Sequence, residues 1–184
     1  MQVLVMGVSG AGKTTIAQRL AEALGARFIE GDDFHPPANI ERMAAGEPLD
    51  DDCRHHWLLA IAAELRRAIS GGEEVVLACS ALKERYRHLL LAGCPDCHIV
   101  WLRGDQTTIA ERLNSRAGHF MPPSLLFSQF SDLEAPAYSI AADVSRTPDE
   151  IVEELIPKLR AAGANKGRED DCFMPHKITG PRPF

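Results

Sequence analysis

The chain has 184 residues and a mass of 20.2 kDa, with 45% hydrophobic residues, 25% charged residues, 14 glycines and 12 prolines. These values are those of an ordinary globular domain, so they exclude collagen-like, wholly disordered and coiled-coil proteins. The net charge of −6 and the pI of about 5.6 argue against broad contact with nucleic acid, because proteins that bind phosphate backbones usually carry an excess of Lys and Arg.

We expect neither a targeting segment nor a membrane span from the sequence. The first residues are a short apolar run without a basic segment before it or a small-residue cleavage site after it. No stretch reaches the roughly 18 to 20 apolar residues that a membrane-spanning helix needs. The cysteines are odd in number and scattered, which indicates reduced thiols rather than a disulfide framework: Cys53, Cys79, Cys94, Cys97 and Cys172. We therefore expect a cytoplasmic protein.

Strand and helix patterns alternate along the chain. An unbroken apolar run at 3–8 predicts a buried strand, and a helical pattern follows at 14–24 and stops at Gly25. Further strands are predicted at 27–30, 75–79 and 99–102, and further helices at 39–45, 54–69, 82–92, 105–116 and 147–160. This alternation predicts an α/β fold with a parallel sheet between two layers of helices.

The pattern forms one domain over residues 1–163, without an internal repeat. From residue 164 onward the chain becomes polar, with scattered prolines and glycines and few side chains that could pack. We expect residues 164–184 to form a mobile C-terminal tail.

A phosphate-binding loop stands between the first strand and the first helix. The string GVSGAGKT at residues 7–14 matches GxxxxGK[ST] in the strand–loop–helix context that supports this motif. Its glycines let the backbone N–H groups point inward, Lys13 reaches the β and γ phosphates, and the Thr14 hydroxyl can bind Mg²⁺. The predicted nucleotide-binding residues are Gly7, Ser9, Gly10, Ala11, Gly12, Lys13, Thr14 and Thr15.

Other motifs narrow the class of P-loop protein. The chain lacks the DxxG and NKxD elements of a GTPase, and the string SGGE at 70–73 is better explained as a turn than as a transporter ATPase signature. The strand at 75–79 does not end in an acidic residue, so the usual Walker B carboxylate is missing. Glu30, at the end of the second strand, is the candidate for the metal's acid, held directly or through water.

Several strings in order along the chain resemble those of gluconate kinases (gluconokinases). They are GDDFHP at 31–36, GEPL at 46–49, CSALK at 79–83, RAGHFMP at 116–122, SQF at 128–130 and LEAP at 133–136. The resemblance runs from Met6 to about Arg160. It implies a nucleoside-monophosphate-kinase-like fold with a five-stranded sheet and a helical lid at about 117–136. It also implies a homodimer that uses ATP and Mg²⁺ to phosphorylate D-gluconate at its 6-hydroxyl.

The same resemblance assigns residues to the acceptor. It implies that Asp32 is the partner or base of the acceptor hydroxyl. The sugar acid would be lined by Arg54, Lys83, Tyr86, Arg87 and His119. This assignment is physically reasonable, because a guanidinium pairs with a carboxylate through two hydrogen bonds. Without it, Arg54, Lys83 and Arg87 would be taken for solvated residues on helices.

Two arginines lie four residues apart on the helix before the expected lid. One of them, Arg116, is expected to stabilise the charge of the transferring phosphate. The other, Arg112, is expected to cover the adenine. Removing a charge-stabilising arginine of this kind can reduce the rate about 10³-fold or more.

The chain also departs from the family's usual pattern. Cys53 and His56 stand where Asp and Pro are usual, and Glu30, His88 and Leu91 replace Asp, Asp and Arg. These changes affect the acceptor pocket more than the nucleotide site. Two alternatives therefore stay open: a kinase for another aldonate or for a shikimate-like or nucleotide acceptor, and a nucleotide-binding module without catalysis.

Two further patterns have structural explanations. The CxxC pair Cys94 and Cys97 lacks a second pair of metal ligands and is expected to be a plain connecting loop. The apolar residues Phe127, Phe130 and Leu133 have helical spacing and are expected to be the packing face of the lid helix.

Overall fold

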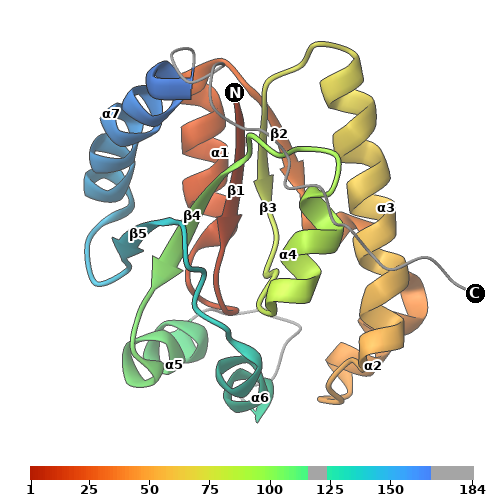
Figure 1. The fold of residues 1–184 in the computed structure, drawn as a ribbon. Coiled ribbons are helices and arrows are strands. Elements are labelled where there is room, and N and C mark those ends of the chain that lie inside the picture. Colours follow the sequence, from red (N-terminus) through yellow and green to blue (C-terminus); the bar gives the residue numbers. More distant parts are fainter. Residues whose placement is uncertain (116–123, 167–184) are drawn as a thin grey trace, which may run out of the picture.

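The structure is a computed structural model that describes residues 1–115 and 124–166. It contains a sheet of five strands with helices on both faces (Figure 1). The elements in chain order are β1 (Gln2–Met6), α1 (Lys13–Leu24), β2 (Arg27–Glu30), the 3-10 helix η1 (Gly31–Phe34), α2 (Pro37–Ala44), α3 (Asp51–Ser70), β3 (Val75–Ala78), α4 (Glu84–Leu91), β4 (His98–Arg103), α5 (Gln106–Ser115), α6 (Ser124–Asp132), β5 (Ile140–Asp143) and α7 (Pro148–Lys166).

The strands follow the order β2-β3-β1-β4-β5, and every neighbouring pair is parallel. β1 therefore lies in the middle, with β3 and β4 beside it. Because parallel strands end at the same edge of a sheet, the segments after β1, β2 and β3 come together there. The α/β fold with a five-stranded parallel sheet is confirmed.

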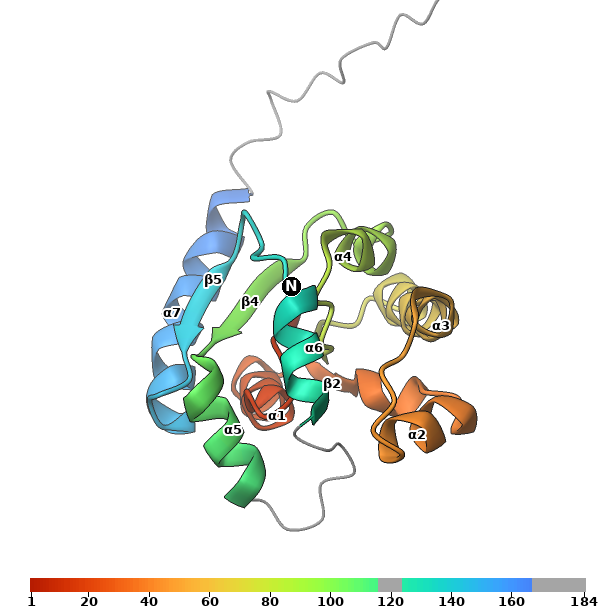
Figure 2. The ribbon, with the colours of Figure 1, turned by 90° about the horizontal axis from the view of Figure 1, so that it is seen from below.

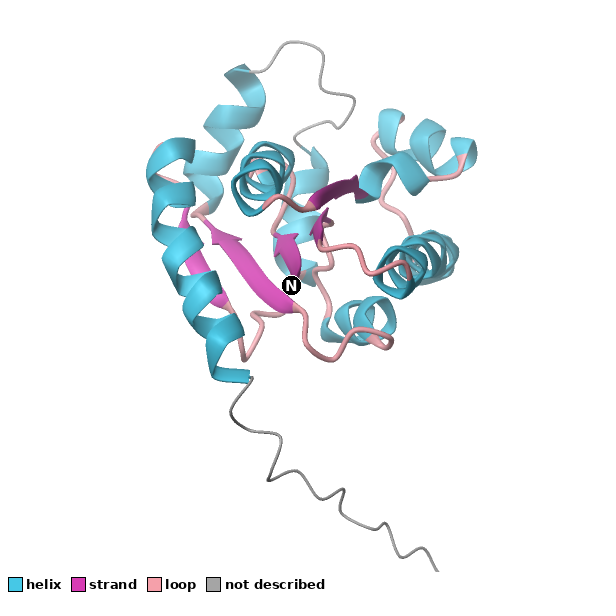
Figure 3. Cartoon of the chain, turned by 90° about the horizontal axis from the view of Figure 1, so that it is seen from above, coloured by secondary structure: helices cyan, strands magenta, loops and turns pink. Residues whose placement is uncertain are grey.

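Side-chain alternation along β1 divides the core between the two faces of the sheet. Val3 and Val5 pack with apolar residues of α1 and α7, whereas Leu4 and Met6 pack with those of α3 and α4. Figure 3 shows these two pairs of helices on opposite sides of the strands. Burial on both faces explains why β1 and β3 are unbroken apolar runs without alternation.

Some element bounds differ from the sequence-based prediction. α3 starts at Asp51 rather than residue 54, because the Asp50 carboxylate caps it by accepting the Cys53 backbone N–H at 2.8 Å. β5, at the sheet edge, was not recognised from its residues, since its burial is irregular. α7 ends at Lys166, so the last helix continues past the predicted domain end at residue 163. Residues 167–184 lie outside the described part of the chain.

Helix α6 crosses the molecule at the edge where the strands end, between α5 and α2 when seen from below (Figure 2). Its packing face differs from the prediction. Phe130 and Leu133 are partly buried against the core, as expected, but Phe127 is 68% exposed. Leu125 and Leu126 are buried instead, so the inward face of the helix is turned toward them.

The surface shows no large apolar area among the described residues. Four large apolar side chains are exposed, and they lie on separate elements and loops: Ile40, Leu59, Phe127 and Tyr138. Single exposed apolar residues are normal for a folded domain. Within 1–115 and 124–166, the helices are all too short or too polar to cross a bilayer.

Candidate active site

The phosphate-binding loop connects β1 to α1 at the carboxyl edge of the sheet. α1 begins at Lys13, and no side chain caps its first turn in the described structure. Backbone N–H groups at such a helix start can bind phosphate oxygens. The Lys13 ammonium donates to the Val8 carbonyl at 3.2 Å, so the lysine side chain folds back across the loop.

Gly10 and Gly12 of the loop are needed for different reasons. Gly10 has φ of 84°, and a Cβ there would lie 2.7 Å from the Leu113 side chain on α5. Gly12 also has a left-handed φ of 90°, but no atom lies within 4 Å of its Cβ position. Gly10 thus allows both the turn and the close packing of α5, whereas Gly12 is required by the backbone conformation alone.

A glutamine on α6 reaches the same loop. The Gln129 side-chain oxygen accepts the Ser9 backbone N–H at 2.7 Å, and its amide nitrogen donates to the Ser9 hydroxyl at 3.2 Å. Sequence reasoning missed this residue as part of the site, although the string SQF contained it. The contact places α6 directly against the expected phosphate-binding backbone.

Thr14 and Glu30 form an oxygen pair beside the loop. The Thr14 hydroxyl donates to Glu30 Oε2 at 2.7 Å, and Glu30 Oε1 accepts the Asp32 backbone N–H at 3.4 Å. Burial raises the pKa of Glu30, and the charge of Asp32 raises it further, against the lowering effect of the Thr14 hydrogen bond. A hydroxyl and a carboxylate are the hard oxygen ligands that Mg²⁺ prefers, so the predicted metal residues fit this ion.

Asp32 lies across from the loop with an aromatic wall behind it. Its Oδ1 is 3.9 Å from His35 Nε2, and the His35 ring stacks on Trp57 with ring centres 4.2 Å apart. The Trp57 indole N–H donates to the Gly31 carbonyl at 2.7 Å, which fixes the wall to η1. Burial lowers the pKa of His35, and the charge of Arg54 lowers it further while Asp32 opposes this, so the ring is neutral near pH 7.

A cationic cluster forms the far end of the site. Arg54 Nη1 donates to the Tyr86 hydroxyl at 3.2 Å and to Asp132 Oδ2 at 2.7 Å. The Lys83 ammonium lies 3.1 Å from Asp132 Oδ1 and 3.4 Å from Asp51 Oδ1. Asp51 also accepts the Tyr86 hydroxyl hydrogen bond. The structure therefore brings Arg54, Lys83 and Tyr86 together in one cluster, and their contact with a sugar acid stays a prediction.

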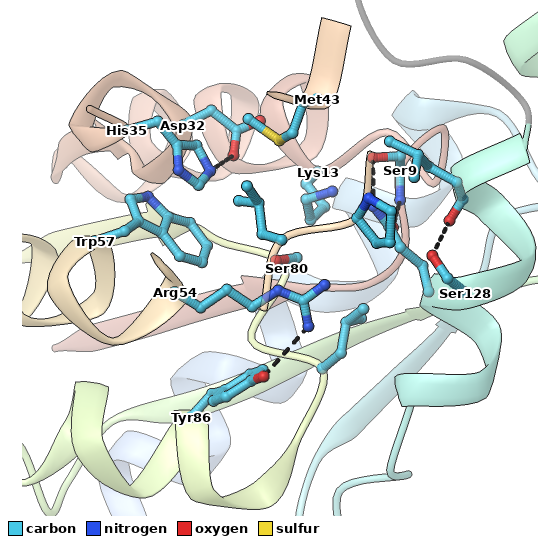
Figure 4. Close-up of a pocket in the computed structure, with 15 residues that line it drawn as sticks. Ser9, Lys13, Asp32, His35, Met43, Arg54, Trp57, Ser80, Tyr86 and Ser128 are labelled. Carbon is cyan, nitrogen blue, oxygen red and sulfur yellow. Dashed lines mark hydrogen bonds and ion pairs between the residues drawn. The ribbon is translucent and has the colours of Figure 1, made fainter. Parts of the chain in front are cut away.

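Several of these groups line one cavity, shown in Figure 4, whereas Lys83 contacts the cluster around Arg54 without lining the cavity itself. The Arg54 guanidinium points into it from one side, and Lys13 lies on the opposite side. The polar residues that line it are Ser9, Lys13, Asp32, His35, Arg54, Ser80, Tyr86, Ser128 and Gln129. The cavity thus joins the phosphate-binding loop to the Arg54 guanidinium.

Arg87 does not reach this cavity. Its guanidinium is buried and donates to the Ala81 and Leu82 carbonyls at 3.0 and 2.8 Å. Ala81 is the one non-glycine residue with a positive φ, 40°, among those that the structure describes. Arg87 therefore stabilises the strained turn after β3, which positions Lys83, and the structure does not support direct contact with a substrate.

A second hollow lies on the other side of the phosphate-binding loop. It is lined by Gly10, Ala11, Gly12, Thr15, Arg112 and the segment 145–148. The Arg112 guanidinium donates to the Val144 carbonyl, which joins α5 to the segment after β5. Arg112 thus lies next to the loop, and its contact with the nucleotide stays a prediction, whereas the segment 145–148 was not predicted from the sequence.

Two predicted residues, Arg116 and His119, lie outside the described residues, as does the first part of the expected lid. Among the described residues, the cysteines do not line the cavity. Cys79 is fully buried behind β3, and burial raises the pKa of its thiol to about 12. Cys94 and Cys97 form no disulfide and lie in the turn between α4 and β4, where the Cys97 N–H donates to the Cys94 carbonyl at 3.2 Å.

Comparison with known proteins gives the family. Residues 3–135 match the family model described as an AAA domain. The chain is 46% identical over 164 residues to the gluconokinase of Gluconobacter oxydans, which covers 86% of this chain and 91% of the relative. It is 47% identical over 133 residues to the thermosensitive gluconokinase of Escherichia coli, covering 72% of this chain and 71% of the relative. The chain belongs to the gluconokinase family.

A solved structure agrees with this assignment. The crystal structure of a gluconokinase from Sinorhizobium meliloti superposes with a TM-score of 0.83 and 42% sequence identity. The match covers 92% of this chain and 97% of that one. The family resemblance predicted from the short strings is therefore confirmed over most of the chain, and the chain is a kinase.

Proposed function

We propose that this protein transfers the γ-phosphoryl group of ATP to the 6-hydroxyl of D-gluconate, giving 6-phospho-D-gluconate and ADP. The observation that carries the proposal is the single cavity in which Lys13 and the phosphate-binding loop face Arg54. A small acid with a carboxylate at one end and a hydroxyl at the other matches this arrangement. The names of the related proteins support gluconate as that acid.

The donor half holds the triphosphate through backbone and charge. The N–H groups of the loop and the start of α1 bind phosphate oxygens, and Lys13 leaves the Val8 carbonyl to contact the β and γ phosphates. Thr15 and Arg112 line the hollow that would take the nucleoside. Thr14 and Glu30 would hold Mg²⁺, which supplies charge neutralisation for the phosphates when it is bound.

The acceptor half orients the sugar acid. Arg54 binds the carboxylate, with Tyr86 and Lys83 beside it, because a charged hydrogen bond is stronger than a neutral one. Asp32 accepts a hydrogen bond from the 6-hydroxyl and takes its proton as the new P–O bond forms. Since phosphoryl transfer is largely dissociative, the main effect of Asp32 is to orient the hydroxyl toward the γ-phosphate.

Several parts of the proposal rest on the family resemblance. Arg116 would stabilise the charge on the transferring phosphate, His119 would contact the substrate, and 117–136 would form a lid. The homodimer is also a proposal, which sedimentation velocity tests. Fractionation of cells tests the expected cytoplasmic location.

An acceptor panel tests the proposed function. ADP release, measured by a coupled assay with ATP and Mg²⁺, is compared for gluconate, other aldonates, shikimate and nucleoside monophosphates. We expect gluconate to give the highest kcat/KM. Turnover of shikimate or a nucleotide but not of gluconate would overturn the proposal, as would normal ATP binding with no product from any acceptor.

A further inference from the structure

Asp132 is a charged residue whose contacts the proposed chemistry does not use. It is the last residue of α6, and its two oxygens engage two different cations. Oδ2 lies 2.7 Å from Arg54 Nη1, and Oδ1 lies 3.1 Å from Lys83 Nζ. The side chain of Asp132 is 26% exposed, that of Arg54 13% and that of Lys83 20%, so these ion pairs are better shielded from water than a typical surface ion pair.

The position of Asp132 separates it from the acceptor itself. Arg54 and Tyr86 line the cavity, whereas Asp132 does not. Asp132 and the Tyr86 hydroxyl both bind Nη1 of Arg54. Figure 4 shows the guanidinium reaching toward the middle of the cavity while one nitrogen is bonded to Tyr86. Asp132 therefore holds the Arg54 side chain without lining the cavity itself.

The charges of the cluster leave a small excess. Arg54, Lys83 and Arg85 are positive, and Asp51 and Asp132 are negative, with Asp51 in contact with both Lys83 and Arg85. Three positive and two negative groups give a net charge of +1. One incoming carboxylate neutralises that charge, whereas a dianion exceeds it and a neutral group leaves it unbalanced.

Asp132 stays ionised in this cluster of cations near pH 7. Burial alone would raise its pKa, but hydrogen bonds from Arg54 and Lys83 outweigh this effect and lower the pKa below the usual value. The negative charge beside Arg54 is thus a permanent part of the folded protein near pH 7.

We propose that Asp132 is a specificity-determining residue. Its carboxylate reduces the positive charge of the cluster formed by Arg54 and Lys83. The acceptor site therefore favours an acceptor that carries a single negative charge at the end remote from the transferred phosphate. This inference rests on the proposed function, because it assumes that Arg54 faces the acid end of the acceptor. The inference goes beyond the proposed function because it states which acceptors should bind poorly. Acids with a dianionic group at that end are disfavoured by charge.

A charge series at C1 tests the role of Asp132. D-glucitol, D-gluconate and D-glucitol 1-phosphate have the same 6-hydroxyl and carry zero, one and about two negative charges at C1. Affinities for the wild-type protein and for Asp132→Asn are measured by calorimetry without nucleotide, and kcat/KM is measured with ATP. Because Asn has nearly the same shape as Asp, the difference between the two proteins reports charge.

We expect Asp132→Asn to raise the affinity for glucitol 1-phosphate relative to gluconate about tenfold, because a unit charge a few ångströms away acts strongly in a partly buried site. The affinity for gluconate relative to the affinity for glucitol should rise as well. Asp132→Ser, which also removes the charge, should show the same change if Asn disturbs folding. Ratios within twofold of wild type in the folded variants would overturn the proposal.

Glu64→Gln is the matched control. Glu64 also bridges two cations, since it binds Arg27 at 2.5 Å and Arg67 at 2.7 Å, but it does not line the cavity. This variant should leave all ratios unchanged. A wild-type protein that does not turn over gluconate would contradict the proposed function, whereas unchanged binding ratios in Asp132→Asn would contradict only the role of Asp132.

Discussion

Arg54 provides the cation that the proposed acceptor meets inside the cavity. We predict that Arg54→Ala raises the KM for gluconate about 10- to 100-fold, because a hydrogen bond to a charged group contributes about 1.5 to 3 kcal/mol. The KM for ATP should change less than about twofold, since the donor half lies on the opposite side of the cavity. Steady-state kinetics with each substrate varied in turn gives both values.

Arg67→Ala is the control for this prediction, because Arg67 is an exposed arginine that binds Glu64 on the outer face of α3. It should leave both KM values unchanged. Gluconate kinetics in Arg54→Ala that match the wild type would show that the carboxylate binds elsewhere.

The pKa of Glu30 predicts how metal binding depends on pH. Burial raises this pKa, so the side chain takes up a proton at a higher pH than an exposed glutamate, whose pKa is about 4.3. A protonated carboxyl is a poor Mg²⁺ ligand. The Mg²⁺ concentration needed for half-maximal activity should therefore be constant at neutral pH and increase as the pH falls toward the raised pKa.

The measurement is a Mg²⁺ titration of activity at several pH values between about 5 and about 8. Glu30→Gln is the informative comparison, because it cannot titrate. Its Mg²⁺ requirement should be higher throughout and should lose the increase at low pH. An identical pH profile in the variant would assign the titration to another group.

Residue roles were predictable from the sequence only where a motif fixed them. The motif at 7–14 placed Lys13 and Thr14 correctly relative to β1 and α1. Arg87 was misplaced because its partners are carbonyls of a turn that no sequence pattern reveals. Asp132 and Gln129 were not assigned to the site because they reach it from an element more than 100 residues beyond the phosphate-binding loop.

At the scale of elements, the junction of β2 and η1 is packed tightly against the backbone of β3. A Cβ on Gly31 would lie 2.6 Å from the Ala78 carbonyl oxygen of β3, which is backbone and cannot rotate away. We predict that Gly31→Ala lowers the free energy of unfolding by about 1 to 3 kcal/mol, because overpacking forces the backbone to shift. Urea denaturation followed by circular dichroism measures this change.

Gly163→Ala, on a helix, should have the opposite effect on stability to Gly31→Ala. Gly163 lies in α7, with only the Met1 sulfur about 4.0 Å from the Cβ position. This substitution should increase the free energy of unfolding by up to about 1 kcal/mol, because alanine is the better helix former. Equal effects of the two substitutions would show that the contact between β2 and β3 tolerates a shift.

Most elements were predictable because their physical signals are local. Buried strands such as β1 and β3 are continuous apolar runs, and α1 has helical spacing and a glycine stop. β5 lacked such a signal, because an edge strand of four residues has few contacts that constrain its sequence. The start of α3 depended on one side-chain cap at Asp50, which spacing alone does not reveal.

At the scale of the molecule, residues 1–166 contain every described side chain that lines the cavity. We therefore predict that a chain ended after Lys166 keeps kcat and both KM values within about twofold of the full chain. Steady-state kinetics of the two proteins tests this expectation. A large loss of activity would give residues 167–184 a role in the reaction, and a chain ended after Gly163 measures what the last residues of α7 add to stability.

The central place of β1 separates two tasks. On one side of it, β3 and β2 with the segments that follow them supply most of the side chains that face the acceptor, together with α6. On the other side, α5 and the segment after β5 border the nucleoside hollow. Substitutions can therefore change the residues that face the acceptor without changing those that border the nucleoside hollow. Transplanting the η1, α2 and early α3 residues of a related enzyme should change the chosen alcohol without altering the choice of nucleotide, which makes this scaffold a modular starting point for engineered kinases.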